Sequence, residues 1–538
     1  MRYAPALYIL NVHDVELILA LMVAVAVVAT AARALRVPYP ILLVLGGLLL
    51  ALTPAVPNVE LAPDLVFLLF LPPLIYIAGF DTSPREIKAQ LRPILSLAVG
   101  LVLATTLVVG AVAHSLLPEL GWPVAFALGA ILAATDAVAA TALLRDIGAP
   151  RRVVTLLESE SLFNDATALV AYQAALGAAA TASFSPTEAS ARILFAGVGG
   201  IVVGLAVGRA IVWLRRRLND APVEITISLL TPFAAYLPAE RLGLSGVLAT
   251  ATAGVFVGWF APRIMGSDTR LRGRAVWEFL VFVLNGLAFI LIGLQLSTVL
   301  GEQPTRSVPE LLAVTALIAA TVILVRLGWA FAATGLTAGF RRPRHDHQPP
   351  PPWRETVVVG WAGLRGVVSL ATALALPLSL AGRHILLFVT FGVILVTLVG
   401  QGLTLPLVSR LLRIGGDGTE ERDEVHARTI AAEAAVARID ELASEWPGHL
   451  PLIDTLRSQY MHRGTHLGET RSSGQGSNGS VGDEDAEQEL LEHRLIRRAV
   501  IDAERAAVLR LRDRGAINDE VWRRVERDLD LEELRMEA

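Results

Sequence analysis

A cluster of polar side chains interrupts an otherwise apolar stretch of the chain at 158–172, whose sequence is ESESLFNDATALVAY. On a helix, Glu160 and Asn164 lie four residues apart and share a face. Ser161 and Asp165 repeat this spacing, so the four groups form one polar stripe. An ionised carboxylate inside a bilayer is costly unless it is paired, hydrated or bound to an ion. The stripe therefore predicts a pathway for ions or protons rather than a single acid that reaches water at a helix end.

Two further polar points lie deep in apolar runs. Thr135 and Asp136 interrupt ALGAILAATDAVAATALLRD, and Arg365 lies between Gly363 and Gly366 in WAGLRGVVSLATALALP. The small residues around both points favour helices that break, and broken helices direct backbone groups at an ion near the membrane midplane. Two alternatives stay open here. Thr135 and Asp136 could instead form a hydrogen bond between helices that only stabilises the fold. Arg365 could likewise form an ion pair with a purely structural role.

The composition identifies the elements that must position these residues as membrane helices. The chain has 538 residues, of which 54% are hydrophobic and 18% charged, and its mean hydropathy is +0.56. Such values exclude an ordinary soluble globular protein and predict an all-α polytopic membrane protein. The sequence contains no Cys, which excludes disulfides and thiol chemistry. The first residues lack the pattern of a cleaved signal peptide and predict a short lead into a retained first helix.

About thirteen apolar runs are long enough to cross roughly 30 Å of hydrocarbon. The runs at 38–53 and 222–238 are short and contain Pro, so they could be bent or only partly spanning. The predicted spans are 14–34, 38–53, 62–80, 94–117, 122–145, 153–179, 190–214, 222–238, 243–262, 275–298, 308–338, 355–382 and 384–412.

The charges of the connecting loops predict the orientation of these spans. Alternate loops hold nineteen Lys and Arg residues, whereas the opposite loops hold only Arg241, Arg306 and Arg383. By the positive-inside rule the basic side is cytoplasmic, which places the N-terminus outside and the C-terminus inside. Spans one to six and eight to thirteen form two sets of six, in which the fifth and twelfth spans are equivalent. This predicts two inverted six-helix repeats with a broken helix at the same place in each.

Charged residues are sparse before about residue 413 and dense after it. Residues 414–538 therefore predict a cytoplasmic helical tail that follows a transmembrane domain at 1–413. Within the tail, 424–446, about 450–463, 487–514 and 517–536 have helical patterns, and the Gly/Ser/acidic segment 465–486 predicts disorder. Regulation, dimer contacts and solubility all remain open as the role of the tail.

Three motifs in this order carry a resemblance to a known family: TDAVA at 135–139, ESLFNDATALV at 160–170 and GLRGVVSLA at 363–371. Together with FLPPLIYIAGF they resemble the monovalent cation:proton antiporter-1 family, which includes bacterial NhaP-type Na+/H+ antiporters and eukaryotic NHE exchangers. The resemblance covers roughly 14–413. It implies core helices at about 94–179 and 308–412, in which the broken helices cross at the midplane, dimerisation or scaffold helices at about 14–80 and 190–298, and a homodimer.

The resemblance also implies roles for individual residues. Arg365 is implied to pair with Glu160 and to hold the two broken regions together. Asn164 matches the Asn of the family's Asn-Asp pair, where electrogenic relatives carry Asp-Asp, so electroneutral one-for-one exchange is implied. The implied cation- and proton-binding residues are Asp165, Asp136, Ser161, Thr135 and Glu160. Of these, Asp136, Asp165, Ser161 and the Thr135 main chain are implied to bind Na+, and Glu160 is implied to act through water. Asn164 and Arg365 are implied to support the site.

These expectations combine into one function. Na+ and H+ would compete for Asp136 and Asp165, and the burial of an empty, ionised site would couple the two fluxes. We expect a plasma-membrane antiporter in the lipid bilayer with a role in pH and sodium homeostasis, and not an enzyme. We expect no cofactor besides the transported Na+ and H+, and no nucleic-acid partner. K+ or Li+ in place of Na+ stays open, and a cation channel or an intramembrane aspartyl hydrolase fits the clustered polar residues less well.

Overall fold

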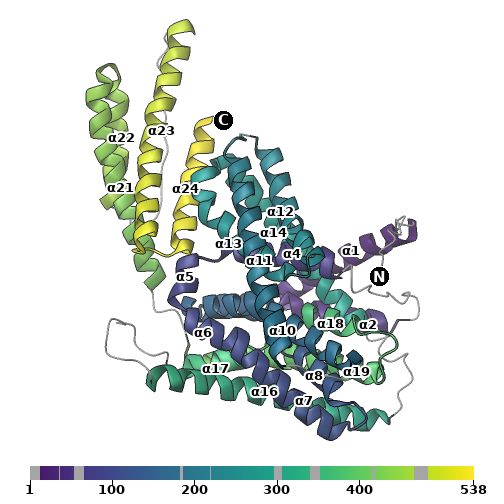
Figure 1. Cartoon of the computed structure of the whole chain (residues 1–538). Helices are drawn as coiled ribbons and strands as arrows, with labels where there is room; N and C mark the ends of the chain where they lie inside the picture. Colours follow the sequence, from purple (N-terminus) through teal and green to yellow (C-terminus); the bar gives the residue numbers. More distant parts are fainter. Residues whose placement is uncertain are drawn as a thin grey trace. The chain divides into compact units, whose positions relative to one another are not determined.

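The structure is a computed structural model, and over the residues that it describes it is entirely helical (Figure 1). The described residues are 12–35, 37–53, 66–181, 186–218, 220–295, 306–339, 352–414, 419–465 and 483–537. The predicted N-terminal lead and most of the predicted disordered segment 465–486 lie outside these ranges.

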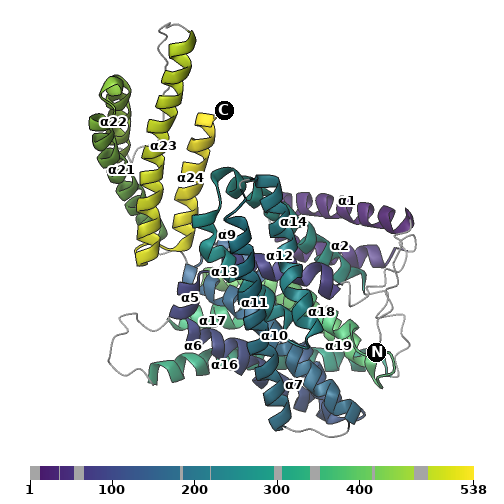
Figure 2. The ribbon, with the colours of Figure 1, turned by 45° about the horizontal axis from the view of Figure 1, so that its top comes forward.

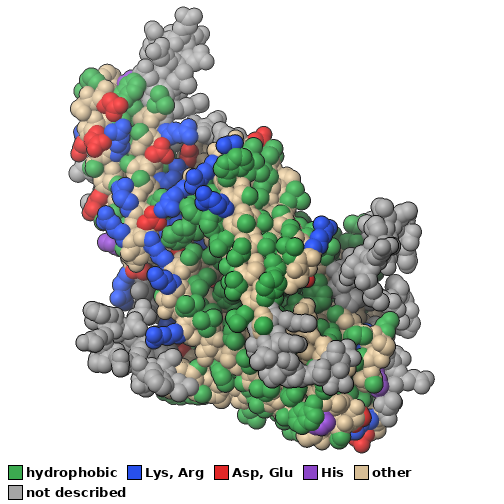
Figure 3. Space-filling model, in the orientation of Figure 1, with side chains coloured by type: hydrophobic (Ala, Val, Ile, Leu, Met, Phe, Trp, Pro, Cys, Tyr) green, Lys and Arg blue, Asp and Glu red, His purple; other side chains and the backbone are tan. Residues whose placement is uncertain are grey.

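The chain divides into two compact units. The first comprises Met1–Leu218, Thr226–Ala261 and Val276–Gly415, and the second comprises Asn219–Ile225, Pro262–Ala275 and Gly416–Ala538. Hydrophobic side chains cover most of the visible face of the first unit, whereas charged side chains of both signs mix over the tail helices (Figure 3). This contrast is the one expected between a surface in lipid and a surface in water.

Long apolar helices dominate the first unit. Its first half contains α1 (Val12–Leu35), α2 (Tyr39–Ala51), η1 (Val66–Phe70), α4 (Leu71–Asp81), α5 (Pro84–Ala89), α6 (Leu91–Leu95), η2 (Ser96–Leu101), α7 (Val102–Leu116), α8 (Trp122–Ile131), α9 (Ala137–Asp146) and α10 (Arg151–Thr181). There follow α11 (Pro186–Arg215), α12 (Ala221–Arg241), α13 (Gly246–Ile264), α14 (Ser267–Leu294), α16 (Val308–Gly339), α17 (Trp353–Trp361), α18 (Val367–Leu374), α19 (Arg383–Leu395), η3 (Val396–Gln401) and α20 (Gly402–Leu411), where α12, α13 and α14 each have a part in the second unit.

Seven stretches of the described residues are long and apolar enough to cross a membrane. They are Glu16–Leu35, Leu91–Leu116, Leu194–Arg215, Gly246–Ile264, Ser267–Leu294, Val308–Gly335 and Arg383–Leu411. Shorter apolar helices cover Tyr39–Ala51, Phe67–Asp81 and Trp122–Ile131. The chain is therefore a multi-pass helical membrane protein.

Glycines allow several of these helices to approach backbone to backbone. A Cβ atom added to Gly293 of α14 would lie 2.2 Å from the Val44 carbonyl oxygen of α2. A Cβ atom added to Gly258 of α13 would lie 2.2 Å from the Phe80 carbonyl oxygen of α4. The run at 243–258 is rich in small residues, which suits such close helix contacts. Such contacts pack α14 closely against α2 and α13 closely against α4.

Two helices of the first unit are broken in the middle, as predicted. The run at 122–145 forms α8 and α9, which are separated by an unwound segment at 132–136. The run at 355–382 forms α17 and α18, separated by an unwound segment at 362–366. Figure 2 shows α17 beside α16, against which it packs.

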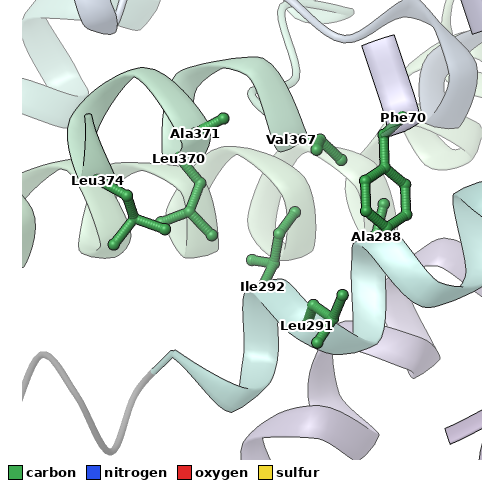
Figure 4. Close-up of a pocket in the computed structure, with 8 residues that line it drawn as sticks. All are labelled: Phe70, Ala288, Leu291, Ile292, Val367, Leu370, Ala371 and Leu374. Carbon is green, nitrogen blue, oxygen red and sulfur yellow. The ribbon is translucent and has the colours of Figure 1, made fainter. Parts of the chain in front are cut away.

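A small apolar pocket separates the half-helix α18 from α14 and η1 (Figure 4). Every side chain that lines it is a hydrocarbon. These side chains therefore form no hydrogen bonds that would hold α18 in one position along α14. The residues that line it are Phe70, Ala288, Leu291, Ile292, Val367, Leu370, Ala371 and Leu374.

The second unit is built mainly from the tail helices, which are α21 (Thr419–Glu445), η4 (Pro447–His449), α22 (Leu450–Thr465), α23 (Asp483–Arg514) and α24 (Asp519–Glu537). Val521, Val525 and Leu529 recur every four residues and form one buried face of α24. They pack with Ala427 and Ala431 of α21 and with buried side chains of α23. The tail is thus a folded helical bundle over the residues described.

Candidate functional site

Thr135 and Asp136 lie in the first break, where the backbone groups are not engaged in helix hydrogen bonds. Asp136 is the residue that precedes α9, and its carboxylate accepts a hydrogen bond from the Val138 N–H at 2.9 Å. An aspartate at this position satisfies a free N–H of the helix start and suits the positive end of the helix dipole. The break therefore fixes the Asp136 carboxylate at the start of a half-helix.

The second break crosses the first at the same place. The backbone N–H of Asp136 donates to the Leu364 carbonyl at 2.8 Å, which joins the two unwound segments directly. A Cβ atom added to Gly366 would lie 2.0 Å from the Asp136 Oδ2 atom. Gly366 thus leaves the space that the carboxylate occupies, and any larger residue would displace it.

The polar stripe of α10 faces these breaks. Ser161 Oγ donates to the Thr135 carbonyl at 2.9 Å, and the Asn164 side-chain amide donates to Thr135 Oγ1. Thr135 Oγ1 in turn donates to Glu160 Oε1 at 3.2 Å. The Asp165 carboxylate is buried and close enough to Asp136 to interact with it electrostatically. The structure thus brings all the predicted binding residues together.

Several polar atoms of this cluster are buried without a hydrogen-bond partner among the described residues. They are Asp165 Oδ1, Asn164 Oδ1 and Arg365 Nε. Buried polar atoms are nearly always paired with protein, water or an ion, so unpaired ones mark a place for such a ligand. A hard cation prefers carboxylate, carbonyl and hydroxyl oxygens, and Asp136, Asp165, Thr135 and Ser161 supply these groups.

Arg365 does not pair directly with Glu160, so that prediction is wrong. Arg365 Nη1 instead donates to the Ala134 carbonyl at 3.2 Å and to the Ala133 carbonyl at 3.4 Å. These carbonyls lie in the unwound segment just after α8, where helix hydrogen bonds do not occupy the backbone acceptors. Ser369 Oγ, at 3.3 Å, also donates to the Ala134 carbonyl. Arg365 therefore does join the two breaks, through the backbone.

The partner of Glu160 is Arg326 of α16. Arg326 Nη2 donates to Glu160 Oε2 at 2.8 Å, a second contact joins Nη1 to Oε1, and both side chains are at most 2% exposed. Arg326 Nε also donates to the Val359 carbonyl near the end of α17, at 3.2 Å. Each broken helix thus has an arginine at the carbonyl end of its first half.

Sequence reasoning missed two further contacts at the second break. Gln401 Nε2 donates to the Trp361 carbonyl at 3.0 Å, and Thr397 Oγ1 accepts from the Arg365 N–H at 3.3 Å. Both side chains belong to η3, whose π-helical turn lies beside the unwound segment. Their signal in the sequence is weak, because an uncharged Thr or Gln in an apolar run also suits an ordinary hydrogen bond between helices. Glu158, the first residue of the stretch at 158–172, lies outside the cluster in a partly exposed ion pair with Arg145.

The chain was compared with known families and proteins. Residues 19–411 match the family model described as "Sodium/hydrogen exchanger, transmembrane". An uncharacterised Na+/H+ exchanger of Mycobacterium tuberculosis is 34% identical, with 98% of this chain and 96% of that protein covered. The Na+/H+ antiporter ApNhaP of Aphanothece halophytica is 35% identical, with 80% of this chain and 81% of that protein covered.

A solved structure shares the fold. The sodium proton antiporter MjNhaP1 of Methanocaldococcus jannaschii matches with a TM-score of 0.58 and 21% identity, and 74% of this chain and 97% of that chain are covered. This likeness shows the fold, and the match to the family model, with the full-length relatives, shows the family. The chain belongs to the sodium/hydrogen exchanger family, which consists of membrane antiporters rather than enzymes.

Proposed function

We propose that this protein exchanges a monovalent cation, Na+ in the first place, for H+ across the plasma membrane. The observation that supports this most strongly is the unpaired Asp165 Oδ1 atom, buried beside Asp136 where the two broken helices cross. Cytoplasmic pH and sodium homeostasis would be the outcome.

The proposed mechanism is competition for one site. With Asp136 and Asp165 ionised, the site binds a cation among their oxygens, the Ser161 hydroxyl and the Thr135 carbonyl. Protonation removes the negative charge and releases the cation. Movement of the empty, ionised site through the membrane would leave buried charge uncompensated, so only the loaded states cross.

Alternating access follows from movement of the core helices against the scaffold helices. The apolar pocket between α18 and α14 supports this, because hydrocarbon contacts slide more easily than hydrogen-bonded ones (Figure 4). We also propose the finer architecture expected from the sequence: thirteen spans in two inverted repeats, an external N-terminus, a cytoplasmic tail and a homodimer.

Electroneutral exchange is part of the proposal. Asn164 stands beside Asp165, donates to Thr135 and cannot carry a proton between the two sides. One fewer titratable carboxyl group removes one proton from the cycle. We expect the transport rate in proteoliposomes to be the same with and without an imposed membrane potential. A rate that follows the potential would contradict this stoichiometry.

The assay of the function itself uses everted vesicles with a pH-sensitive dye. Addition of Na+ should restore the quenched fluorescence. If Na+, K+ and Li+ all leave the fluorescence unchanged between pH 6 and 9, the proposal is contradicted.

K+ or Li+ as the transported cation is the second candidate. A relative from Bacillus pumilus, 34% identical and named a sodium, potassium, lithium and rubidium/H+ antiporter, favours testing each cation separately.

Gly366→Ala is expected to reduce exchange at least about tenfold, because the added methyl group would meet the Asp136 carboxylate at 2.0 Å. Gly400→Ala on the adjoining η3 is the matched control, since nothing lies within 4 Å of its added Cβ atom. Initial rates of dye recovery in vesicles with equal amounts of inserted protein would measure the difference. Equal rates for both variants would show that Gly366 does not shape the site.

A further inference from the structure

The last tail helix contacts the first turns of α14 within the second unit. Arg270, in the fourth position of α14, donates from Nε to Asp530 Oδ2 of α24 at 2.8 Å, and its Nη2 contacts Oδ1 of the same carboxylate. The Glu526 Oε1 atom lies 3.6 Å from Arg270 Nε. Arg263 also pairs with Asp513 of α23 at 2.7 Å. Both elements that flank the turn before α14 are thus tied to the tail.

The pair at Arg270 differs from an ordinary surface ion pair. The side chain of Arg270 is 13% exposed, and those of Asp530 and Glu526 are 3% and 6% exposed. Arg270 Nη1 donates in addition to the Met265 carbonyl. A bidentate arginine–carboxylate contact that is largely removed from water is strong and geometrically specific, whereas exposed pairs contribute little.

Other charges surround this contact on each side. From α23, Arg505 donates to Asp530 at 3.0 Å and to Glu533 at 2.6 Å. Arg512 of α23 donates to Asp519 at 2.6 Å and stacks on Trp522. The α21 residues Glu424 and Arg428 pair with Arg524 and Asp528, and Ser267 of α14 hydrogen-bonds Glu533.

The buried Oε1 atom of Glu526 has no hydrogen-bond partner among the described residues. Burial, together with the negative charge of the neighbouring Asp530, raises the pKa of Glu526 to about 7. The positive charge of Arg270, and more weakly those of Arg505 and Arg512, lower this pKa and only partly offset the rise. An opened α24 would expose a carboxyl group with its ordinary pKa of 4.5. Between these two values the open state binds fewer protons, so the closed state loses stability as pH rises toward 7.

We propose that α24 is a strap that clamps the start of α14 through Arg270, and that this clamp loosens as the surrounding solution changes from acid to alkaline. Below neutral pH, Glu526 is neutral and lies beside the Arg270–Asp530 pair without adding charge. In alkaline solution its ionisation adds a buried negative charge next to Asp530 and Glu533. Because α14 continues as one helix to Leu291 and Ile292 at the apolar pocket, the clamp acts on a helix that borders α18.

Hydrogen exchange on the full-length protein in detergent micelles tests the clamp without any transport assay. Protection factors of α24, corrected for the intrinsic exchange rate, should fall about tenfold between pH 6 and pH 8, as the two pKa values imply. In Glu526→Gln this pH dependence should disappear. Arg270→Gln should lower protection of α24 at both pH values by about tenfold or more.

Two matched variants serve as controls. Arg272→Gln removes an exposed arginine of the same helix, which pairs only locally with Asp268, and Asp528→Asn removes an exposed acid of α24. Both should keep the wild-type response, and protected α21 and α22 would show that each variant is folded. Equal protection of wild-type α24 at the two pH values would overturn the pH response. An undiminished protection in Arg270→Gln would overturn the clamp.

Discussion

Asp165→Asn should reduce cation–proton exchange to the background of empty vesicles while the protein stays folded and inserted. The asparagine keeps the size of the side chain but removes both the negative charge that holds the cation and the site of protonation. Because Asp165 Oδ1 has no hydrogen-bond partner among the described residues, the substitution breaks no structural contact of that atom. The measurement is the initial rate of Na+-dependent dye recovery.

Glu158→Gln is the matched control, since Glu158 lies two turns earlier on α10 in a partly exposed ion pair. It should retain most of the exchange activity. Full activity of Asp165→Asn would remove Asp165 from the site, and a loss in both variants would point to a general effect on α10.

Arg326→Met should lower the free energy of unfolding by about 3–5 kcal/mol, because it leaves the Glu160 carboxylate buried without its partner. It also removes the donor to the Val359 carbonyl. Unfolding of the purified protein in mixed micelles, followed by tryptophan fluorescence, would measure the loss. Removing Glu160 as well, in Arg326→Met with Glu160→Gln, should restore part of the stability.

Arg145→Met is the control for this prediction. Arg145 also pairs with a glutamate, but its side chain is 63% exposed, so its loss should cost less than about 1 kcal/mol. Equal losses for the two arginines would show that the buried pair has no special role.

The sequence alone predicts which acids form the site, because a carboxylate in an apolar run is conspicuous and carries a high cost. It also predicts the two breaks, where small residues surround Asp136 and Arg365. The helices that carry the site are absent from the seven long apolar stretches of the described residues. The spanning length of α8 with α9 and of α17 with α18 is interrupted by the breaks, and α10 contains the polar stripe.

The pairing of the arginines could not be predicted in this way. Glu160 and Arg326 are 166 residues apart in the chain, and which arginine meets the carboxylate depends on how α10, α16 and α17 pack and rotate. Arg365 donates instead to backbone carbonyls of the unwound segment after α8, which side-chain patterns in the sequence do not reveal. The signal for Arg326 was its isolation as a charged residue within the long apolar run of α16.

Competition between a cation and a proton can be measured directly by calorimetric titration of the purified protein with Na+. Repeating the titration at one pH in buffers with different ionisation enthalpies gives the number of protons released for each cation bound. Exchange at Asp136 and Asp165 predicts a release that approaches about one proton per cation as the pH is lowered toward the range where the site is protonated. Cation binding with no proton release at any pH would contradict a shared site.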